Sequence, residues 1–337
     1  MKKHIRHDIK AFILIIHSLA AIITVVINLK KIISILICAA VIFSCASCAY
    51  TKRGQAKDNA AATTGKKTYS TYTGLKPLDE VSYKVSDPGN TAGLSNKAVE
   101  HSYGVARDGK PHEISVQSEK YFEDNGFKAV TYDNKTVEKV LYLTFDCGYE
   151  NGYTEKILDV LKEKNVKAAF FCTLDDIKSV PELIARIIKD GHIVGNHSAT
   201  HPSFPSLSRE DMALEIEKCE NYLRKNFGYA PNFFRFPKGE YSANALELVG
   251  SLGYTSVFWS LSYSDWDTDN QKGGDYAFEK VTSRLHPGAV ILLHSVSADN
   301  AAALGRIIDY AENAGYEFRP LDSLPAISQN NYSTTEK

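Results

Sequence analysis

Hydrophobic residues follow two patterns along the chain, and the change between them lies near residue 137. From there on, short runs of β-branched and aromatic residues alternate with stretches in which apolar residues recur at helical spacing. The runs predict strands at 140–145, 168–173, 192–196, 233–234, 254–261, 289–293 and 316–319. The stretches between them predict helices at 154–165, 181–190, 208–227, 244–252, 276–285 and 300–314. About seven such units predict an α/β fold, a distorted parallel (β/α) barrel with its helices outside.

The N-terminal segment has a different pattern, with two long apolar runs. The first covers 11–29 and is long enough to span a bilayer. The second, 32–48, follows a lysine pair and ends in small residues, as a signal peptide does. Cys48 resembles the acylated cysteine of a bacterial lipoprotein, although Cys45 stands where leucine is usual. The segment is either an anchor followed by a signal or a signal whose true start lies near Val26, and a buried apolar hairpin is the alternative.

Charge divides the chain at the same place. The whole chain of 337 residues carries 39 basic and 40 acidic residues. Residues 1–48 hold six of the basic and one of the acidic residues, which leaves 33 against 39, a net charge of −6, for the remainder. This acidic balance argues against nucleic acid as a partner. A basic N-terminus favours the cytoplasmic side, so we expect an enzyme or binding protein outside the membrane, attached to it through 1–48.

The remaining domain boundaries follow composition. Residues 49–100 are polar and small, which predicts a linker. Residues 101–136 contain several aromatic side chains and predict an extension that packs on the barrel. The barrel domain is expected at 137–325, and the polar residues 326–337 predict a disordered tail. Cys172 and Cys219 lie in apolar patterns typical of core positions.

Five ionisable residues follow predicted strands: Asp146, His197, Arg235, Asp265 and His294. In a parallel barrel the active residues gather where strands end, so we expect these side chains to share one site. Each also has a structural interpretation. Asp146 is either a general base or a turn cap, Arg235 forms a bidentate pair with a carboxylate such as Asp146 or a structural salt bridge, and His294 is a general acid or a structural histidine.

Two short motifs add candidate chemistry to this site. His197 and His201 have the spacing that places both imidazoles on one face of a helical turn, where they can share a metal, although two surface histidines fit as well. Asp265 is followed by Trp266, which offers a carboxylate to orient a histidine and an aromatic ring to stack on a sugar. The alternative for this second motif is a core tryptophan beside a surface acid.

The ordered motifs resemble one known family. Thr-Phe-Asp at 144–146, the two histidines of 197–201, Arg-Phe-Pro at 235–237, Asp-Trp at 265–266 and Leu-His at 293–294 are similar to the motifs of polysaccharide deacetylases with a NodB homology domain. The resemblance covers 137–324. The segments 149–153, 258–260 and 270–273 are similar to the branch that de-N-acetylates N-acetylmuramic acid during δ-lactam synthesis in the spore cortex.

The resemblance implies a role for each residue. Asp146 is the expected base, positioned by Arg235, and His294 is the expected acid, tuned by Asp265. His197 and His201 are the expected ligands of a divalent metal, with zinc favoured. The side chains expected to bind the substrate are Trp266, Pro237 and Lys238.

Cys147 departs from the family pattern, because the family has a second aspartate there as a metal ligand. Either its thiolate binds the metal, or water completes a weaker site. The function implied is hydrolysis of N-acetylmuramic acid amides in the peptidoglycan glycan strand. The alternatives are N-acetylglucosamine deacetylation and an inactive glycan-binding protein. The implied location is the outer face of the cell membrane, the cell wall or the forespore intermembrane space.

Overall fold

A curled parallel sheet forms the centre of the molecule. The computed structural model describes residue 70 and residues 72–102 and 104–325. The strands of the sheet are β2 (Ala129–Val130), β3 (Val140–Cys147), β4 (Ala168–Cys172), β5 (Ile193–Asn196), β6 (Phe233–Phe234), β8 (Thr255–Val257), β9 (Ala289–His294) and β10 (Glu317–Phe318). Their order is β10-β3-β4-β5-β6-β8-β2, with β9 also paired to β3.

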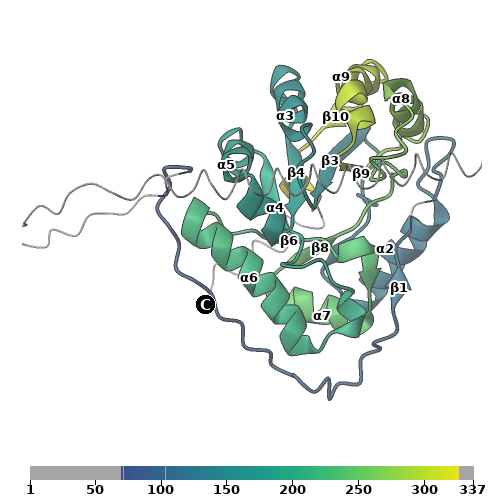
Figure 1. Cartoon of the computed structure of the whole chain (residues 1–337). Helices are drawn as coiled ribbons and strands as arrows, with labels where there is room; N and C mark the ends of the chain where they lie inside the picture. The colour runs from purple at the N-terminus through teal and green to yellow at the C-terminus, as the bar shows by residue number, and fades with distance from the viewer. Residues whose placement is uncertain (1–69, 71, 103, 326–337) are drawn as a thin grey trace, which may run out of the picture. The chain divides into compact units, whose positions relative to one another are not determined.

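Helices surround this sheet (Figure 1). They are α2 (Glu113–Asn125), α3 (Thr154–Glu163), α4 (Leu174–Ser179), α5 (Pro181–Lys189), α6 (Arg209–Phe227), α7 (Ala243–Ser251), α8 (Gly274–Thr282) and α9 (Ala298–Asn313). The predicted barrel is confirmed as a curled half-barrel. Between the chain after β8 and strand β9 the structure has only a bridge, from Leu261 to Ile291, so the barrel is not closed by a full ladder there.

Most predicted elements appear within a few residues of their expected bounds. Helix α6 begins after Ser208, whose hydroxyl accepts a hydrogen bond from the Asp211 N–H, and ends at Gly228 in the left-handed conformation. The strand expected at 254–261 is shorter, because β8 ends at Val257. Helix α4 was not predicted, since its six residues are too few to show a helical period.

Side chains alternate between two cores along β3, and this alternation positions the site. Leu141, Leu143 and Phe145 belong to the core that includes side chains of α3 and α9. Tyr142 belongs to a second core with Phe171 and other residues of the inner face. Because alternate residues of a strand point to opposite faces, Asp146 shares the face of Tyr142 and Cys147 shares the face of Phe145.

The predicted linker at 49–100 is described only at residue 70 and residues 72–100, and this part packs on the body of the protein. Residues 72–102, which we call the strap, run along α6 and then to a two-stranded sheet separate from the central one (Figure 1). The backbone of Val81 exchanges two hydrogen bonds with the Asn221 side chain, and the Tyr83 hydroxyl donates to Glu220. Tyr83 and Val85 also pack against the second hydrophobic core, so the strap is held by polar contacts and by a short alternation of apolar residues.

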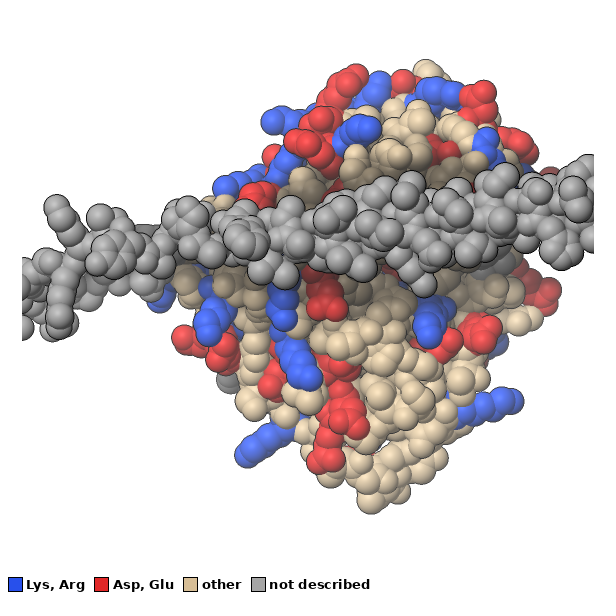
Figure 2. All heavy atoms as spheres, viewed as in Figure 1, with Lys and Arg blue, Asp and Glu red and all other residues tan. Residues whose placement is uncertain are grey.

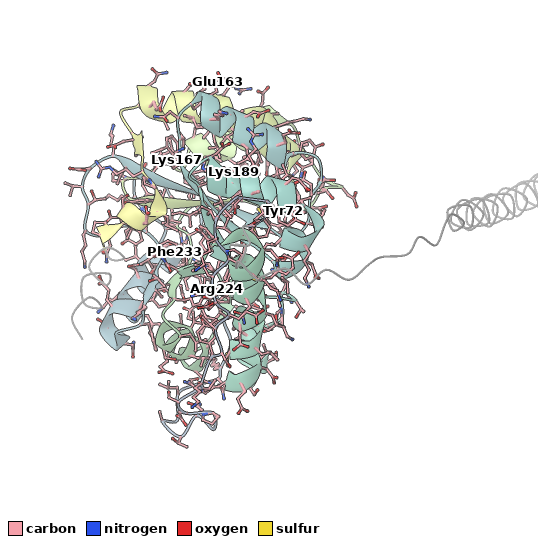
Figure 3. The ribbon with its side chains drawn as sticks, turned by 90° about the vertical axis from the view of Figure 1, so that its left-hand side faces the viewer. Tyr72, Glu163, Lys167, Lys189, Arg224 and Phe233 are labelled. Atoms are coloured by element: carbon pink, nitrogen blue, oxygen red, sulfur yellow. The ribbon has the colours of Figure 1, made fainter. Side chains whose placement is uncertain are left out.

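Both ends of the strap are also fixed. At its start, the Tyr72 ring stacks on Phe227 with 5.2 Å between ring centroids, on the side of the molecule shown in Figure 3. At its end, β1 (Val99–Glu100) pairs antiparallel with β7 (Glu240–Tyr241). Helix α2 and β2 follow within the predicted extension 101–136, and β2 pairs with β8. The predicted segments 1–48 and 326–337 lie outside the described residues.

The described surface carries both signs of charge. Lysine and arginine side chains are interspersed with acidic ones on the face shown in Figure 2, so any binding of a charged glycan must use local groups. Within the described ranges, the structure contains no helix with the length and apolarity needed to cross a membrane.

Candidate active site

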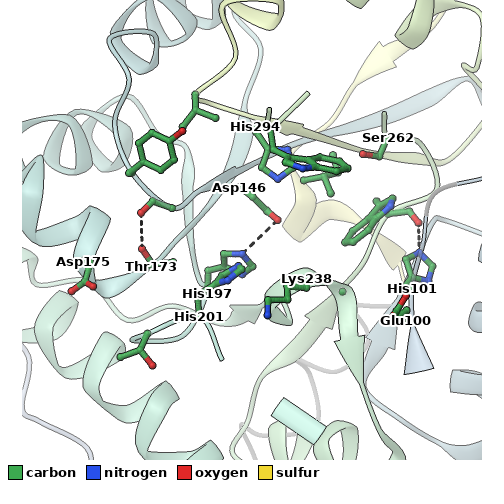
Figure 4. Close-up of a pocket in the computed structure, with 18 of the residues that line it drawn as sticks. Glu100, His101, Asp146, Thr173, Asp175, His197, His201, Lys238, Ser262 and His294 are labelled. Atoms are coloured by element: carbon green, nitrogen blue, oxygen red, sulfur yellow. Dashed lines mark hydrogen bonds and ion pairs between the residues drawn. The ribbon is translucent and has the colours of Figure 1, made fainter. Parts of the chain in front are cut away.

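A cavity of about 710 Å³ lies at the carboxyl ends of the strands (Figure 4). It contains Asp146 from β3, His294 from β9, and the histidines that follow β5, His197 and His201. Trp266 also lines it. Parallel strands bring their carboxyl ends to the same edge, so the predicted strand-exit residues meet at this edge because of the fold.

Arg235 and Asp146 form a buried ion pair beside the cavity. The Arg235 Nη1 donates to Asp146 Oδ1 at 2.7 Å, and the guanidinium is fully buried. Burial favours the neutral acid of Asp146, but the Arg235 guanidinium, with smaller contributions from His197 and His294, outweighs this effect and holds the pKa of Asp146 below its ordinary value. Asp146 is therefore ionised at neutral pH, as a general base must be.

The guanidinium of Arg235 has fixed partners on every side. Its Nε donates to the Val257 carbonyl at 2.8 Å, and its Nη2 donates to Thr144 Oγ1 at 2.9 Å and to the Phe258 carbonyl at 3.1 Å. Its Cζ lies 4.1 Å from the centroid of the Phe171 ring. These contacts leave Arg235 no freedom to turn away from Asp146, so the carboxylate is held in one orientation.

His197 and His201 face each other in a loop, not on the helical turn that their spacing suggested. Their ring centroids are 4.8 Å apart. His201 adopts a positive φ of 57°, and its N–H donates to Ser198 Oγ at 2.9 Å. The loop is held by Asn196, whose Oδ1 accepts from the Ser198 N–H at 2.9 Å. A polar loop, supported by its own side chains, thus presents both imidazoles.

The histidine pair fits a divalent metal. His197 Nδ1 donates to the Arg235 carbonyl at 2.8 Å, which leaves Nε2 as the free nitrogen, 3.6 Å from Asp146 Oδ2. Burial lowers the pKa of His197, and burial together with His197 lowers the pKa of His201 to about 4. Both imidazoles are therefore neutral, as metal ligands must be. Two neutral imidazoles that face each other are ligands that zinc accepts, and catalytic zinc sites leave further positions for water.

His294 is oriented by Asp265 on the other side of the cavity. Oδ1 of Asp265 accepts from His294 Nδ1 at 2.7 Å, and Oδ2 accepts from the His294 backbone N–H at 2.7 Å. Asn300 Nδ2 donates to the same Oδ2 at 2.6 Å. Burial acts to lower the pKa of His294, but the charge and hydrogen bond of Asp265 outweigh burial and raise that pKa. His294 can therefore carry a proton near neutral pH, with Nε2 as its remaining nitrogen.

The predicted substrate-binding residues have different positions. Trp266 is half exposed at the cavity, and its ring lies edge to face with His294 at 5.7 Å between centroids. Lys238 also lines the cavity and has a positive φ of 58° in the turn Pro237–Gly239. Pro237 is buried and does not line the cavity, so its contribution is to shape this turn.

Cys147 lies away from the histidine pair. Its side chain packs in the outer core, and its Sγ accepts a hydrogen bond from Ser295 Oγ at 3.3 Å. Among described residues, no metal-competent group unites Cys147 with His197 and His201. The structure therefore does not support the interpretation of Cys147 as a ligand of the histidine metal, because the strand directs residue 147 to the face opposite Asp146.

Several residues of the site were not predicted. Thr144 holds Arg235, and Asn300 holds Asp265. Both stand in segments that the sequence analysis had already assigned, Thr144 within a quoted motif and Asn300 at the start of a predicted helix. Glu100, His101 and Ser102 reach the cavity from the strap, and no signal in the sequence connects them to the motifs.

Comparisons with known proteins agree on one family. A sequence model of polysaccharide deacetylases matches residues 133–257. The peptidoglycan-N-acetylmuramic acid deacetylase PdaA of Bacillus subtilis is 43% identical over 194 residues, which are 57% of this chain and 74% of the relative. A peptidoglycan-N-acetylglucosamine deacetylase of Bacillus cereus is 36% identical over 188 residues, which are 54% of this chain and 66% of that relative.

Solved structures give the same result. The structure of Bacillus subtilis PdaA, described as a family 4 carbohydrate esterase, matches with a TM-score of 0.65 at 38% identity. The match covers 68% of this chain and 98% of that one.

Proposed function

Since this chain belongs to the polysaccharide deacetylase family, we propose that it removes the acetyl group from N-acetylmuramic acid in peptidoglycan. The chain is a metal-dependent carbohydrate amide hydrolase of that family. The observation that carries the proposed reaction is the presence, in one cavity, of two groups whose pKa values are shifted in opposite directions. The Asp146 carboxylate has a lowered pKa and the His294 imidazole a raised one, which assigns base and acid.

Asp146 is the proton acceptor in the proposed reaction. Its Oδ1 is occupied by Arg235, whereas Oδ2 lies toward His197. Oδ2 takes a proton from a water molecule as the water oxygen forms a bond to the acetyl carbonyl carbon. Arg235 keeps the carboxylate oriented during this step and does not itself exchange a proton.

His294 completes the reaction on the opposite side. Its Nδ1–H is bound to Asp265, so Nε2–H is free to donate. This proton passes to the amide nitrogen as the carbon–nitrogen bond breaks, which releases acetate and leaves an amine on the sugar. Asp265 stabilises the protonated imidazole before the transfer, and Asn300 keeps Asp265 in place.

His197 and His201 are the residues that would hold the metal, with water completing its ligand set, and we propose zinc because imidazole ligands suit it. A divalent metal, when bound, polarises the acetyl carbonyl as a Lewis acid. The chain's contribution is to keep both imidazoles neutral and to fix the tautomer of His197 through the Arg235 carbonyl.

Two observations support N-acetylmuramic acid as the substrate. The relative with 43% identity is named as a deacetylase of this sugar. Lys238 places a cationic side chain at the cavity, where it can bind the lactyl carboxylate that distinguishes muramic acid from glucosamine. The second candidate substrate is N-acetylglucosamine, because the Bacillus cereus relative is named for that activity.

We also propose where the enzyme works. The two apolar runs and the lysines of residues 1–48 support attachment to the outer face of the cytoplasmic membrane. The resemblance to the δ-lactam branch supports a role in the spore cortex, where the product amine and the lactyl carboxyl group would form the lactam amide with release of water.

The test is muropeptide analysis by mass spectrometry after glycan strands are incubated with the zinc-loaded protein. We expect muramic residues to lose one acetyl group while glucosamine residues keep theirs. Free glucosamine alone would establish the second candidate instead. Asp146→Asn should abolish acetate release, whereas Asp159→Asn, on the exposed face of α3, should not alter it. Glycan binding without acetate release by the wild-type protein would establish an inactive binding protein.

A further inference from the structure

Two cysteines and one aspartate form a compact buried cluster outside the cavity. Cys147 ends β3 and lies directly opposite Cys172, which ends β4. Asp176 comes from the first turn of α4, which starts directly after β4. One ligand atom from each of the three residues lies within 4.8 Å of the other two.

The Asp176 carboxylate has no hydrogen-bond partner among the residues that the structure describes. Only 4% of the residue is exposed. Among described residues, no hydrogen bond or ion pair to its carboxylate oxygens is present, although its backbone N–H donates to Thr173 Oγ1. Burial, with a smaller effect of Glu150, raises the pKa of Asp176 to about 7. A buried carboxylate without hydrogen bonds is costly, so this side chain lies where a cation would stabilise it.

The three ligand atoms suit a thiophilic metal. Zinc binds thiolate sulfur at about 2.3 Å and carboxylate oxygen at about 2.0–2.2 Å. Two sulfur atoms on one tetrahedral zinc are then separated by roughly 3.8 Å, which the observed cluster allows. A disulfide between the two cysteines would use both sulfur atoms and still leave Asp176 without a partner, so the cluster as a whole favours a metal.

We propose that Cys147, Cys172 and Asp176 form a second metal site, which binds Zn²⁺ separately from the histidine pair. Binding releases the two thiol protons to solvent, and the two thiolates with the carboxylate surround the cation. Ser295 Oγ, 3.3 Å from Cys147 Sγ, lies where it can complete the coordination or hold a water molecule. The site belongs to the outer core, whereas the histidine pair belongs to the cavity.

A cation there would stabilise two strand ends that carry the reaction. Cys147 directly follows Asp146, and the Cys172 carbonyl accepts the His197 N–H at 3.1 Å. The Cys147 carbonyl in turn accepts the Thr173 N–H at 3.1 Å. Linking β3, β4 and α4 through one ion therefore fixes the backbone behind the catalytic base and one histidine.

The experiment uses Co²⁺ as a spectroscopic probe for sulfur ligands. The full chain is prepared as His197→Ala/His201→Ala, stripped of metal under reducing conditions and titrated with Co²⁺. We expect a sulfur-to-cobalt charge-transfer absorption that saturates at one equivalent and is lost when Zn²⁺ is added. Replacing Cys172 by serine in this background should abolish the absorption. Replacing Cys219, a buried cysteine outside the cluster, should preserve it.

A second measurement needs no cysteine variant, so it remains decisive if such variants do not fold. X-ray absorption at the zinc edge of the zinc-loaded protein should show sulfur neighbours at about 2.3 Å. A spectrum with nitrogen and oxygen neighbours alone would overturn the proposal. It would also be overturned by a Cys147–Cys172 disulfide in the protein as isolated, detected in the linked peptides, or by absorption that persists after Cys172→Ser. None of these results depends on deacetylase activity, so the proposed function is tested separately.

Discussion

His294 Nδ1 lies 2.7 Å from Oδ1 of Asp265, and the second oxygen of the same carboxylate accepts the His294 backbone N–H. One buried carboxylate thus fixes both the ring and the backbone of the histidine. Nε2 is left as the only ring nitrogen able to exchange a proton with a ligand in the cavity. The pair determines the direction of proton donation as well as the pKa of the imidazole.

Replacing Asp265 by asparagine should shift the alkaline limb of the pH profile. Asp265 raises the pKa of His294, and the protonated form is the acid, so activity falls as pH rises through this pKa. Without the carboxylate charge the pKa drops, and the alkaline limb of kcat/KM moves to lower pH. We expect a loss on the order of 10²-fold at alkaline pH. A profile of acetate release with an unmoved alkaline limb would contradict this role.

Replacing Arg235 by methionine should lower the stability of the protein and shift the acid limb of the pH profile. The change leaves Asp146 buried without its partner, which costs about 3–5 kcal/mol of unfolding free energy. The pKa of Asp146 rises, so the acid limb of any remaining activity should move to higher pH. Urea denaturation and pH-dependent acetate release measure the two effects. Arg186→Met serves as the control, because its partners Asp159 and Asp190 lie nearer the surface and the loss should stay within about 1 kcal/mol.

Replacing Lys238 by glutamine should reduce substrate discrimination. If its ammonium binds the lactyl carboxylate, KM for muramic substrates rises about tenfold, the value expected for one charged hydrogen bond. Any activity on glucosamine oligomers should not change, because that sugar lacks the carboxylate. Steady-state kinetics on both substrates measure this difference, with the exposed Lys162→Gln on α3 as control. An equal rise for both substrates would instead indicate a general binding role.

Removing the metal should abolish activity and spare the fold. A chelator is expected to stop acetate release, and Zn²⁺ should restore it. His197→Ala and His201→Ala should each prevent restoration at low metal concentration, because each removes one of two imidazole ligands. Near-ultraviolet circular dichroism monitors the fold. Full activity after exhaustive chelation would contradict the metal assignment.

Replacing Asn221 by alanine tests how firmly the strap is held. The Asn221 side chain accepts the Val81 N–H and donates to the Val81 carbonyl, both at 2.8 Å. Loss of both bonds should cost about 1–3 kcal/mol and raise hydrogen exchange of the strap. Asn125→Ala, which removes one exposed bond to the Tyr121 carbonyl, should have a smaller effect. Unchanged hydrogen exchange at residues 79–85 would show that other contacts hold the strap without the Asn221 side chain.

The strands of the sheet could be predicted from the sequence because each is marked by a local run of apolar residues. Strand β3 is buried throughout, and such strands appear as continuous apolar runs. The five strand-exit residues could be placed together for the same reason, since parallel strands end at one edge. Asp265 and Asn300 stand 35 positions apart, and their hydrogen bond depends on how β9 and α9 return to the cavity. The periodic pattern of apolar residues does not predict how these two elements pack at the cavity.

Other features were missed for physical reasons that differ from this one. Cys147 could be assigned to the histidine metal only while the face of residue 147 was unknown, and strand alternation decided against it. The strap has only a short apolar alternation, at Val81, Tyr83 and Val85, and polar groups of α6 also hold it. Composition alone therefore resembled that of a flexible linker, although the described part is fixed at both ends.

The strap must also be part of any fragment that is to keep the complete wall of the cavity. The family model begins at residue 133, yet Glu100, His101 and Ser102 form part of the cavity wall. A recombinant fragment that starts at residue 133 and keeps the rest of the chain would retain every catalytic candidate and lose this wall, together with the pairing of β1 and β7. Differences in glycan preference between relatives can therefore arise in a stretch that alignments of the shared domain leave out.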